Sequence, residues 1–165
     1  MYCTFEYPYR DINDRLYNII DSYLELNKEI PGGAFLTPMN LQTHNIKDIA
    51  IILAWLKKCL PSAASQLSVG DNDNSLYKGS ELKVDQCWGI IYNKGGKVIK
   101  HNHFPYALSF VYFIKSPRGS SPLIIEGKRI KAEEGKLILF HASQTHWCNT
   151  SKVNGRCCLV GNIRY

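Results

Sequence analysis

The 165-residue sequence lacks several features that would by themselves decide its class. Its longest apolar run, Ile49 to Leu56, is far shorter than the ~20 residues of a membrane span, so we expect no membrane partner. The first residues show neither a basic region nor an apolar stretch, which predicts a cytoplasmic protein. The six cysteines include no Cys-x-x-Cys pair, which argues against a zinc knuckle and predicts free thiols.

The charged residues are not concentrated in any one stretch of the sequence. Lys and Arg outnumber Asp and Glu by 20 to 14, a net charge of +6, but no basic run is longer than two residues. This balance is compatible with an anionic partner such as nucleic acid without indicating one. The length and the 45% hydrophobic content are typical of one globular domain, so we expect residues 1–165 to form a single domain.

The first 70 residues carry a helical pattern. Apolar residues at helical spacing predict a helix over 12–28, ended by Pro31-Gly32-Gly33. A second helix is expected from about residue 45 to 60, where Pro61 should break or restart it. Residues 70–75 read as a polar loop. The part of the chain before about residue 70 is therefore expected to be helical.

From about residue 84 the apolar pattern alternates with a period of two, which is typical of strands. About eight short strands are predicted, over 88–92, 98–103, 108–115, 122–126, 128–132, 136–140, 145–148 and 156–164. Regular short strands following two helices predict a mainly β protein with helical support (α+β). We expect an antiparallel jelly roll over 84–165 with the N-terminal helices packed on one face.

Histidines provide the first functional signal. His101 and His103 are two apart in a predicted strand, so their imidazoles should point to the same face and form half of a metal site. His146, in a short late strand, is the best third ligand, whereas His141 and His44 are expected at the surface. Three nitrogen ligands with open positions would suit catalytic Fe(II), and also Zn, Cu, Ni or Mn.

A second signal is Arg156, which begins a final strand that is otherwise apolar up to Asn162. If its side chain points inward, the guanidinium needs a partner, and its planar fork matches a carboxylate. The alternative is a surface arginine at the start of a strand.

The order and spacing of these features resemble the 2-oxoglutarate- and Fe(II)-dependent oxygenases, whose fold is the double-stranded β-helix. The similarity spans nearly half of the chain. It rests on Trp88-Gly-Ile-Ile-Tyr-Asn-Lys-Gly95, His101-Asn-His103, Leu108-Ser-Phe-Val-Tyr-Phe113, Gly135-Lys-Leu-Ile-Leu-Phe140, His146 and Arg156. Departures are Cys158 where the family has Ser and His141 where Pro is usual.

The resemblance implies roles for five residues. His101 and His146 match the two metal-binding histidines. His103 stands where most of the family carries Asp, but a subgroup with a His-x-His…His motif also has His at this position. Arg156 matches the residue that pairs with the distal carboxylate of 2-oxoglutarate, to which Tyr112 would add a hydroxyl. The implied cofactors are Fe(II) and 2-oxoglutarate.

The implied reaction uses O2 to hydroxylate an unidentified small-molecule or peptide substrate while 2-oxoglutarate is decarboxylated to succinate. Loops near 70–80 and 104–107 would contact the substrate. Two alternatives stay open. Gly95 with His101 and His103 also resembles the first motif of the cupins, some of which are three-histidine dioxygenases, and a jelly roll can serve as a non-catalytic binding module.

Overall fold

The computed structural model describes residues 1–25, 29–30, 33–69 and 81–165, so the loop expected over 70–75 and the substrate contacts expected from 70–80 lie outside the described residues. The elements of the first half are β1 (Tyr2–Glu6), α1 (Ile12–Ser22), β2 (Glu29–Ile30), β3 (Ala34–Leu36), η1 (Leu41–Thr43) and α2 (Lys47–Leu67). The second half contains β4 (Lys83–Tyr92), β5 (Val98–His101), β6 (Leu108–Lys115), β7 (Leu123–Ile125), β8 (Lys128–Ile130), β9 (Lys136–His141), β10 (His146–Cys148) and β11 (Arg156–Arg164).

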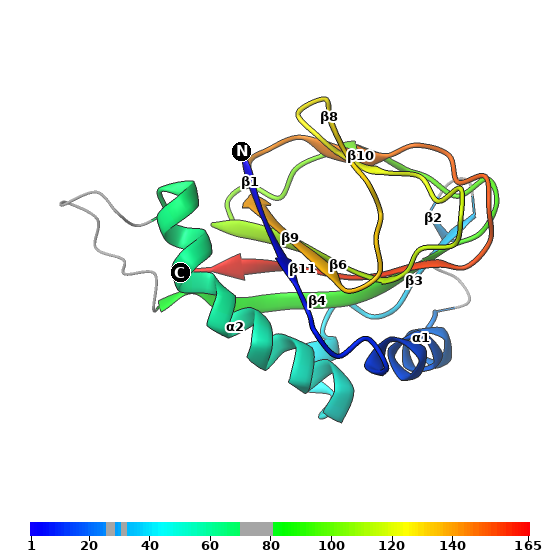
Figure 1. The fold of residues 1–165 in the computed structure, drawn as a ribbon, viewed down its shortest axis with the longest axis horizontal. Coiled ribbons are helices and arrows are strands. Elements are labelled where there is room, and N and C mark those ends of the chain that lie inside the picture. The colour runs from blue at the N-terminus through cyan, green and yellow to red at the C-terminus, as the bar shows by residue number, and fades with distance from the viewer. Residues whose placement is uncertain (26–28, 31–32, 70–80) are drawn as a thin grey trace.

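The strands form two antiparallel sheets that face each other (Figure 1). The larger sheet has the strand order β1-β9-β6-β11-β4-β3-β2, and the smaller sheet has the order β5-β10-β7-β8. Both helices lie on the outer side of the larger sheet in Figure 1. The predicted fold class, a double-stranded β-helix with helices packed on one face, is confirmed.

The N-terminal part is not only helical, which corrects the expected division near residue 70. Strand β1 pairs with β9 along its whole length, from Tyr2 opposite Phe140 to Glu6 opposite Lys136. Strand β3 pairs with β4. The N-terminal strands therefore extend the same sheet that the later strands build.

The helices also differ from expectation. Helix α1 ends at Ser22, and α2 continues through Pro61 to Leu67 without a break. Proline removes the amide that would bond to the carbonyl of Lys57, but both residues are exposed, so water can satisfy that carbonyl. None of the helices in the described ranges is long and apolar enough to span a bilayer.

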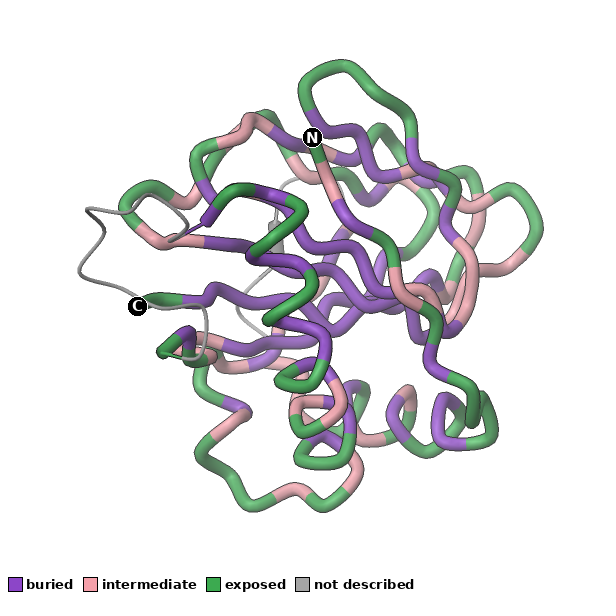
Figure 2. The backbone as a smooth tube through the Cα atoms, turned by 60° about the vertical axis from the view of Figure 1, so that its left-hand side comes forward, coloured by how far each residue is buried: buried purple, intermediate pink, exposed green. Residues whose placement is uncertain are grey.

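Two apolar layers share the strands of the larger sheet. Leu108, Phe110 and Tyr112 of β6 face the helices, while Val111 and Phe113 face the smaller sheet. Because both faces of the sheet are covered, its central strands are buried along most of their length, as Figure 2 shows. The inner layer is the wall of the barrel.

Helix α1 packs closely on this sheet because one strand residue has no side chain. A Cβ on Gly89 would lie 2.3 Å from Cδ1 of Ile20, which is fully buried. Glycine at this position of β4 therefore allows α1 to pack close against the outer face of the sheet.

Candidate metal centre

Strand pairing brings the candidate ligands together at the mouth of the barrel. In the smaller sheet, β5 and β10 are antiparallel and place His101 directly opposite His146. His103 follows two residues after the end of β5 rather than within a strand, and its amide donates to the carbonyl of Ala142 at 2.7 Å. The expected strand therefore ends early, but the three histidines still meet.

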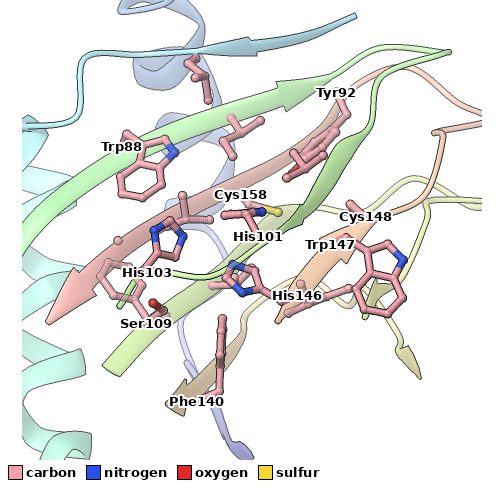
Figure 3. A pocket seen from close by; sticks show the side chains of 18 of the residues that line it. Trp88, Tyr92, His101, His103, Ser109, Phe140, His146, Trp147, Cys148 and Cys158 are labelled. Atoms are coloured by element: carbon pink, nitrogen blue, oxygen red, sulfur yellow. The ribbon is translucent and has the colours of Figure 1, made fainter. Parts of the chain in front are cut away.

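The three imidazoles converge on one point (Figure 3). Ring centroids are 4.3 Å apart for His101 and His146, 4.9 Å for His101 and His103, and 5.1 Å for His103 and His146. One nitrogen from each ring lies within 4.8 Å of the other two. Three imidazoles that converge in this way and leave further positions open fit a divalent transition metal such as Fe(II).

Backbone carbonyls fix the tautomer of two of these rings. Nδ1 of His101 lies 2.8 Å from the carbonyl of Ile99, and Nδ1 of His146 lies 3.0 Å from that of Gln144. A carbonyl can only accept, so Nδ1 donates and Nε2 of each neutral ring keeps a free lone pair. The local backbone thus prepares both rings to bind a metal through Nε2.

Burial keeps two of the three imidazoles uncharged near neutral pH. The pKa of His103 is lowered to about 4 by desolvation and by His101 and His146, and the pKa of His146 is lowered to about 4 mainly by desolvation. Metal binding requires neutral imidazole, so protons compete little with a metal at these two positions at pH 7.

A buried polar residue supports the third ring, and sequence reasoning assigned it no role. The amide nitrogen of Asn162 lies 3.4 Å from Nδ1 of His103 and donates to Oε1 of Gln86 at 2.9 Å. Its oxygen accepts from the hydroxyl of Ser109 at 2.9 Å. Asn162 is 1% exposed, and a buried amide in an apolar strand is the signal that could have pointed to it.

The imidazoles line a cavity of about 220 Å³ between the two sheets. The wall is mostly apolar and aromatic: Trp88 packs edge-on to His103 at 5.9 Å between centroids, and Phe140 packs against His146 at 4.8 Å. The lining residues are Leu36, Met39, Trp88, Ile90, Tyr92, Val98, His101, His103, Ser109, Phe110, Val111, Leu123, Phe140, His146, Trp147, Cys148, Arg156, Cys158, Val160 and Gly161.

Arg156 lies in the same cavity and is 1% exposed. Its guanidinium carbon sits 4.3 Å from the ring centre of Tyr92 and 5.6 Å from that of Phe113. Its Nε and Nη1 are buried and have no hydrogen-bond partner among the described residues. A buried cation with unused donors that faces a cavity fits an anionic ligand with a carboxylate.

The placement of Tyr112 corrects its expected role. Tyr112 pairs with Leu159 on the outer face of β6, and its hydroxyl donates to Oδ1 of Asn13 on α1 at 2.8 Å. It does not line the cavity, so it cannot contact a ligand there. The tyrosine beside the guanidinium is Tyr92 on β4, whose pKa is raised by burial, so it stays protonated at neutral pH.

The two remaining histidines stay outside the cluster. His44 is exposed, as expected, and contacts Asn40. His141 is half-buried rather than facing solvent, because its Nε2 lies 2.7 Å from the carbonyl of Leu67 at the end of α2. Its bond to the helix gives it a structural partner.

No family model and no curated protein matches the sequence. Among solved structures, a prolyl-4-hydroxylase from Pseudomonas putida aligns over 99% of this chain and 91% of its own, at 15% identity and a TM-score of 0.72. HygX from Streptomyces hygroscopicus, with nickel and 2-oxoglutarate bound, aligns over 99% and 82%, at 9% identity and a TM-score of 0.66. The chain has the fold of the 2-oxoglutarate oxygenases.

A third oxygenase-fold structure is a prolyl hydroxylase from Trichoplax adhaerens in complex with a peptide fragment of a hypoxia-inducible factor. It aligns over 98% of this chain and 82% of its own, at 14% identity and a TM-score of 0.62. The resemblance drawn from the sequence is thus confirmed at the level of the fold, over nearly the whole chain.

Proposed function

We propose that this protein is an Fe(II)- and 2-oxoglutarate-dependent oxygenase that hydroxylates an unidentified substrate. The main support for this proposal is that one cavity contains both three converging imidazoles and a buried guanidinium with unused donors. The first group fits a metal and the second fits a carboxylate, which are the two attachment points that such a cofactor pair needs. The oxygenase fold supports the same assignment.

In this proposal, His101, His103 and His146 hold the metal through neutral imidazoles. Arg156 binds the distal carboxylate, and the fixed position of its strand beside β4 and β6 orients the dicarboxylate toward the imidazoles. The apolar wall, including Trp88, keeps bulk water from the cavity. When bound, Fe(II) and 2-oxoglutarate supply O2 activation with decarboxylation of the keto acid to succinate.

A three-histidine dioxygenase that does not use 2-oxoglutarate is the second candidate. It is favoured by the ligand set, because the described residues of the cluster include no carboxylate. It leaves the buried Arg156 without a cofactor to bind. A non-catalytic jelly-roll module would need neither a redox metal nor a keto acid.

The test is an anaerobic titration of metal-free protein with Fe(II) and then 2-oxoglutarate, followed by visible absorption. We expect a metal-to-keto-acid charge-transfer band that is absent in His101→Ala and requires more 2-oxoglutarate in Arg156→Ala. Iron binding without the band would favour the three-histidine dioxygenase. Failure to bind iron would favour a binding module.

A small molecule or a peptide is the proposed substrate class, and a peptide is what the Trichoplax adhaerens hydroxylase binds. We propose a cytoplasmic location, which is supported by six cysteines that are all free and buried.

A further inference from the structure

The cavity contains positive charge but no counter-charge. No Asp or Glu stands among its described lining residues, whereas Arg156 is permanently charged and nearly fully buried. The other ionisable groups besides the histidines are a phenol and thiols, which are uncharged acids at neutral pH. The guanidinium is stabilised by the aromatic faces of Tyr92 and Phe113 and by polar contact with the neutral Tyr92 hydroxyl and Cys148 thiol, none of which carries a negative charge.

A divalent metal would add to this imbalance. Three neutral imidazoles contribute no negative charge, so a metal at the cluster would keep its two positive charges. It would share a cavity of about 220 Å³ with the Arg156 guanidinium. Repulsion between charges is strong where water is scarce, because the effective dielectric constant is low.

We propose that the metal and a dicarboxylate anion bind this cavity as one cooperative unit: the anion supplies the counter-charge that the protein omits, and Arg156 weakens metal binding until the anion arrives. The inference rests on the proposed function, since it assumes the same two occupants. By linkage, the anion must raise the affinity for the metal by the factor by which the metal raises that for the anion.

Equilibrium binding of Co(II) to metal-free protein, measured by calorimetry and visible absorption, tests the charge effect without turnover. Arg156→Gln removes the charge and keeps a shorter, polar amide, so we expect Co(II) alone to bind about tenfold more tightly than to wild type. Arg156→Lys is the matched control at a pH below the pKa of the introduced amine, where it keeps the charge but loses the planar fork. It should bind Co(II) as wild type does and bind 2-oxoglutarate more weakly.

A second pair of measurements separates charge from chelation. Glutarate has the two carboxylates of 2-oxoglutarate but no keto oxygen, and we expect it to raise Co(II) affinity in wild type and not in Arg156→Gln. His103→Asp places a carboxylate in the cluster, so Co(II) alone should bind more tightly and 2-oxoglutarate should increase that affinity by a smaller factor than in wild type.

Two outcomes would overturn the inference. Equal Co(II) affinities for wild type, Arg156→Gln and Arg156→Lys, with 2-oxoglutarate still binding to wild type, would contradict the charge coupling but not the proposed function. A wild-type protein that binds Co(II) but no 2-oxoglutarate would contradict both this inference and the proposed function.

Discussion

Replacing Arg156 by Met should stabilise the metal-free protein, although it removes a side chain from the core. Arg156 is 1% exposed, and its Nε and Nη1 have no partner within the described part of the chain. Replacing a buried charge by an apolar residue of similar shape is often neutral or stabilising, because the desolvation cost disappears. If Arg156 is kept for a ligand, the protein without that ligand should carry this cost.

The size of the effect follows from the contacts. Two unsatisfied buried donors cost roughly 1–3 kcal/mol each, or about 4 kcal/mol together. Methionine loses the cation–π contacts to Tyr92 and Phe113, about 2 kcal/mol together, and leaves a small void that costs about 1 kcal/mol. The balance is a gain of about 1 kcal/mol, which raises Tm by about 2–4 °C in a chain of this length.

Urea unfolding of metal-free wild type and Arg156→Met, each with and without Co(II) and 2-oxoglutarate, measures this gain. The control is Leu159→Met on the same strand, a fully buried and volume-conserving change that should cost less than about 1.5 kcal/mol. The two ligands should stabilise wild type more than the variant and so reverse their order. A metal-free Arg156→Met protein that is more than about 1 kcal/mol less stable than wild type would refute the cost assigned to the unpartnered Nε and Nη1 of Arg156.

Three further predictions concern single residues. His146→Ala should abolish Co(II) binding measured by calorimetry, whereas His141→Ala should retain it, because only the first ring belongs to the cluster. Tyr112→Phe should leave 2-oxoglutarate affinity unchanged and lower the free energy of unfolding by about 1–3 kcal/mol, since Oδ1 of Asn13 loses its donor. Metal-free protein should lose stability as pH falls from about 6.5 to about 4. Folding lowers the pKa values of His103 and His146, so the unfolded chain binds more protons in that range. A urea midpoint that does not change with pH would contradict this.

Much of the fold was readable because its strands follow a simple pattern. The expected bounds of β6 and β11 agree with the structure, since both are long β-forming runs between clear turns. The N-terminal strands were missed because β1 and β3 are short and complete a sheet whose other members lie far away in sequence. Pairing at such separation leaves no local periodic signal.

The metal cluster was predictable for a similar reason. A His-x-His pair is a local signal, and the position of His146 in a late strand matched the fold that the pattern indicated. The structure adds what spacing could not supply: the register that sets His101 opposite His146, and the carbonyls that fix Nδ1 of both rings. Those features depend on pairing and local backbone shape.

The face of the sheet on which Tyr112 lies could not be predicted from the sequence. A strand with both faces buried reads as a continuous apolar run, so its sequence does not reveal which alternate residues face the barrel. The face is set by the register with β11, where Tyr112 lies opposite Leu159 on the helix side. Arg156 was easier to assign because it breaks the apolar pattern of its own strand. A buried charge that the core does not neutralise indicates a ligand. A buried tyrosine whose hydroxyl already has a partner on α1 gives no such indication.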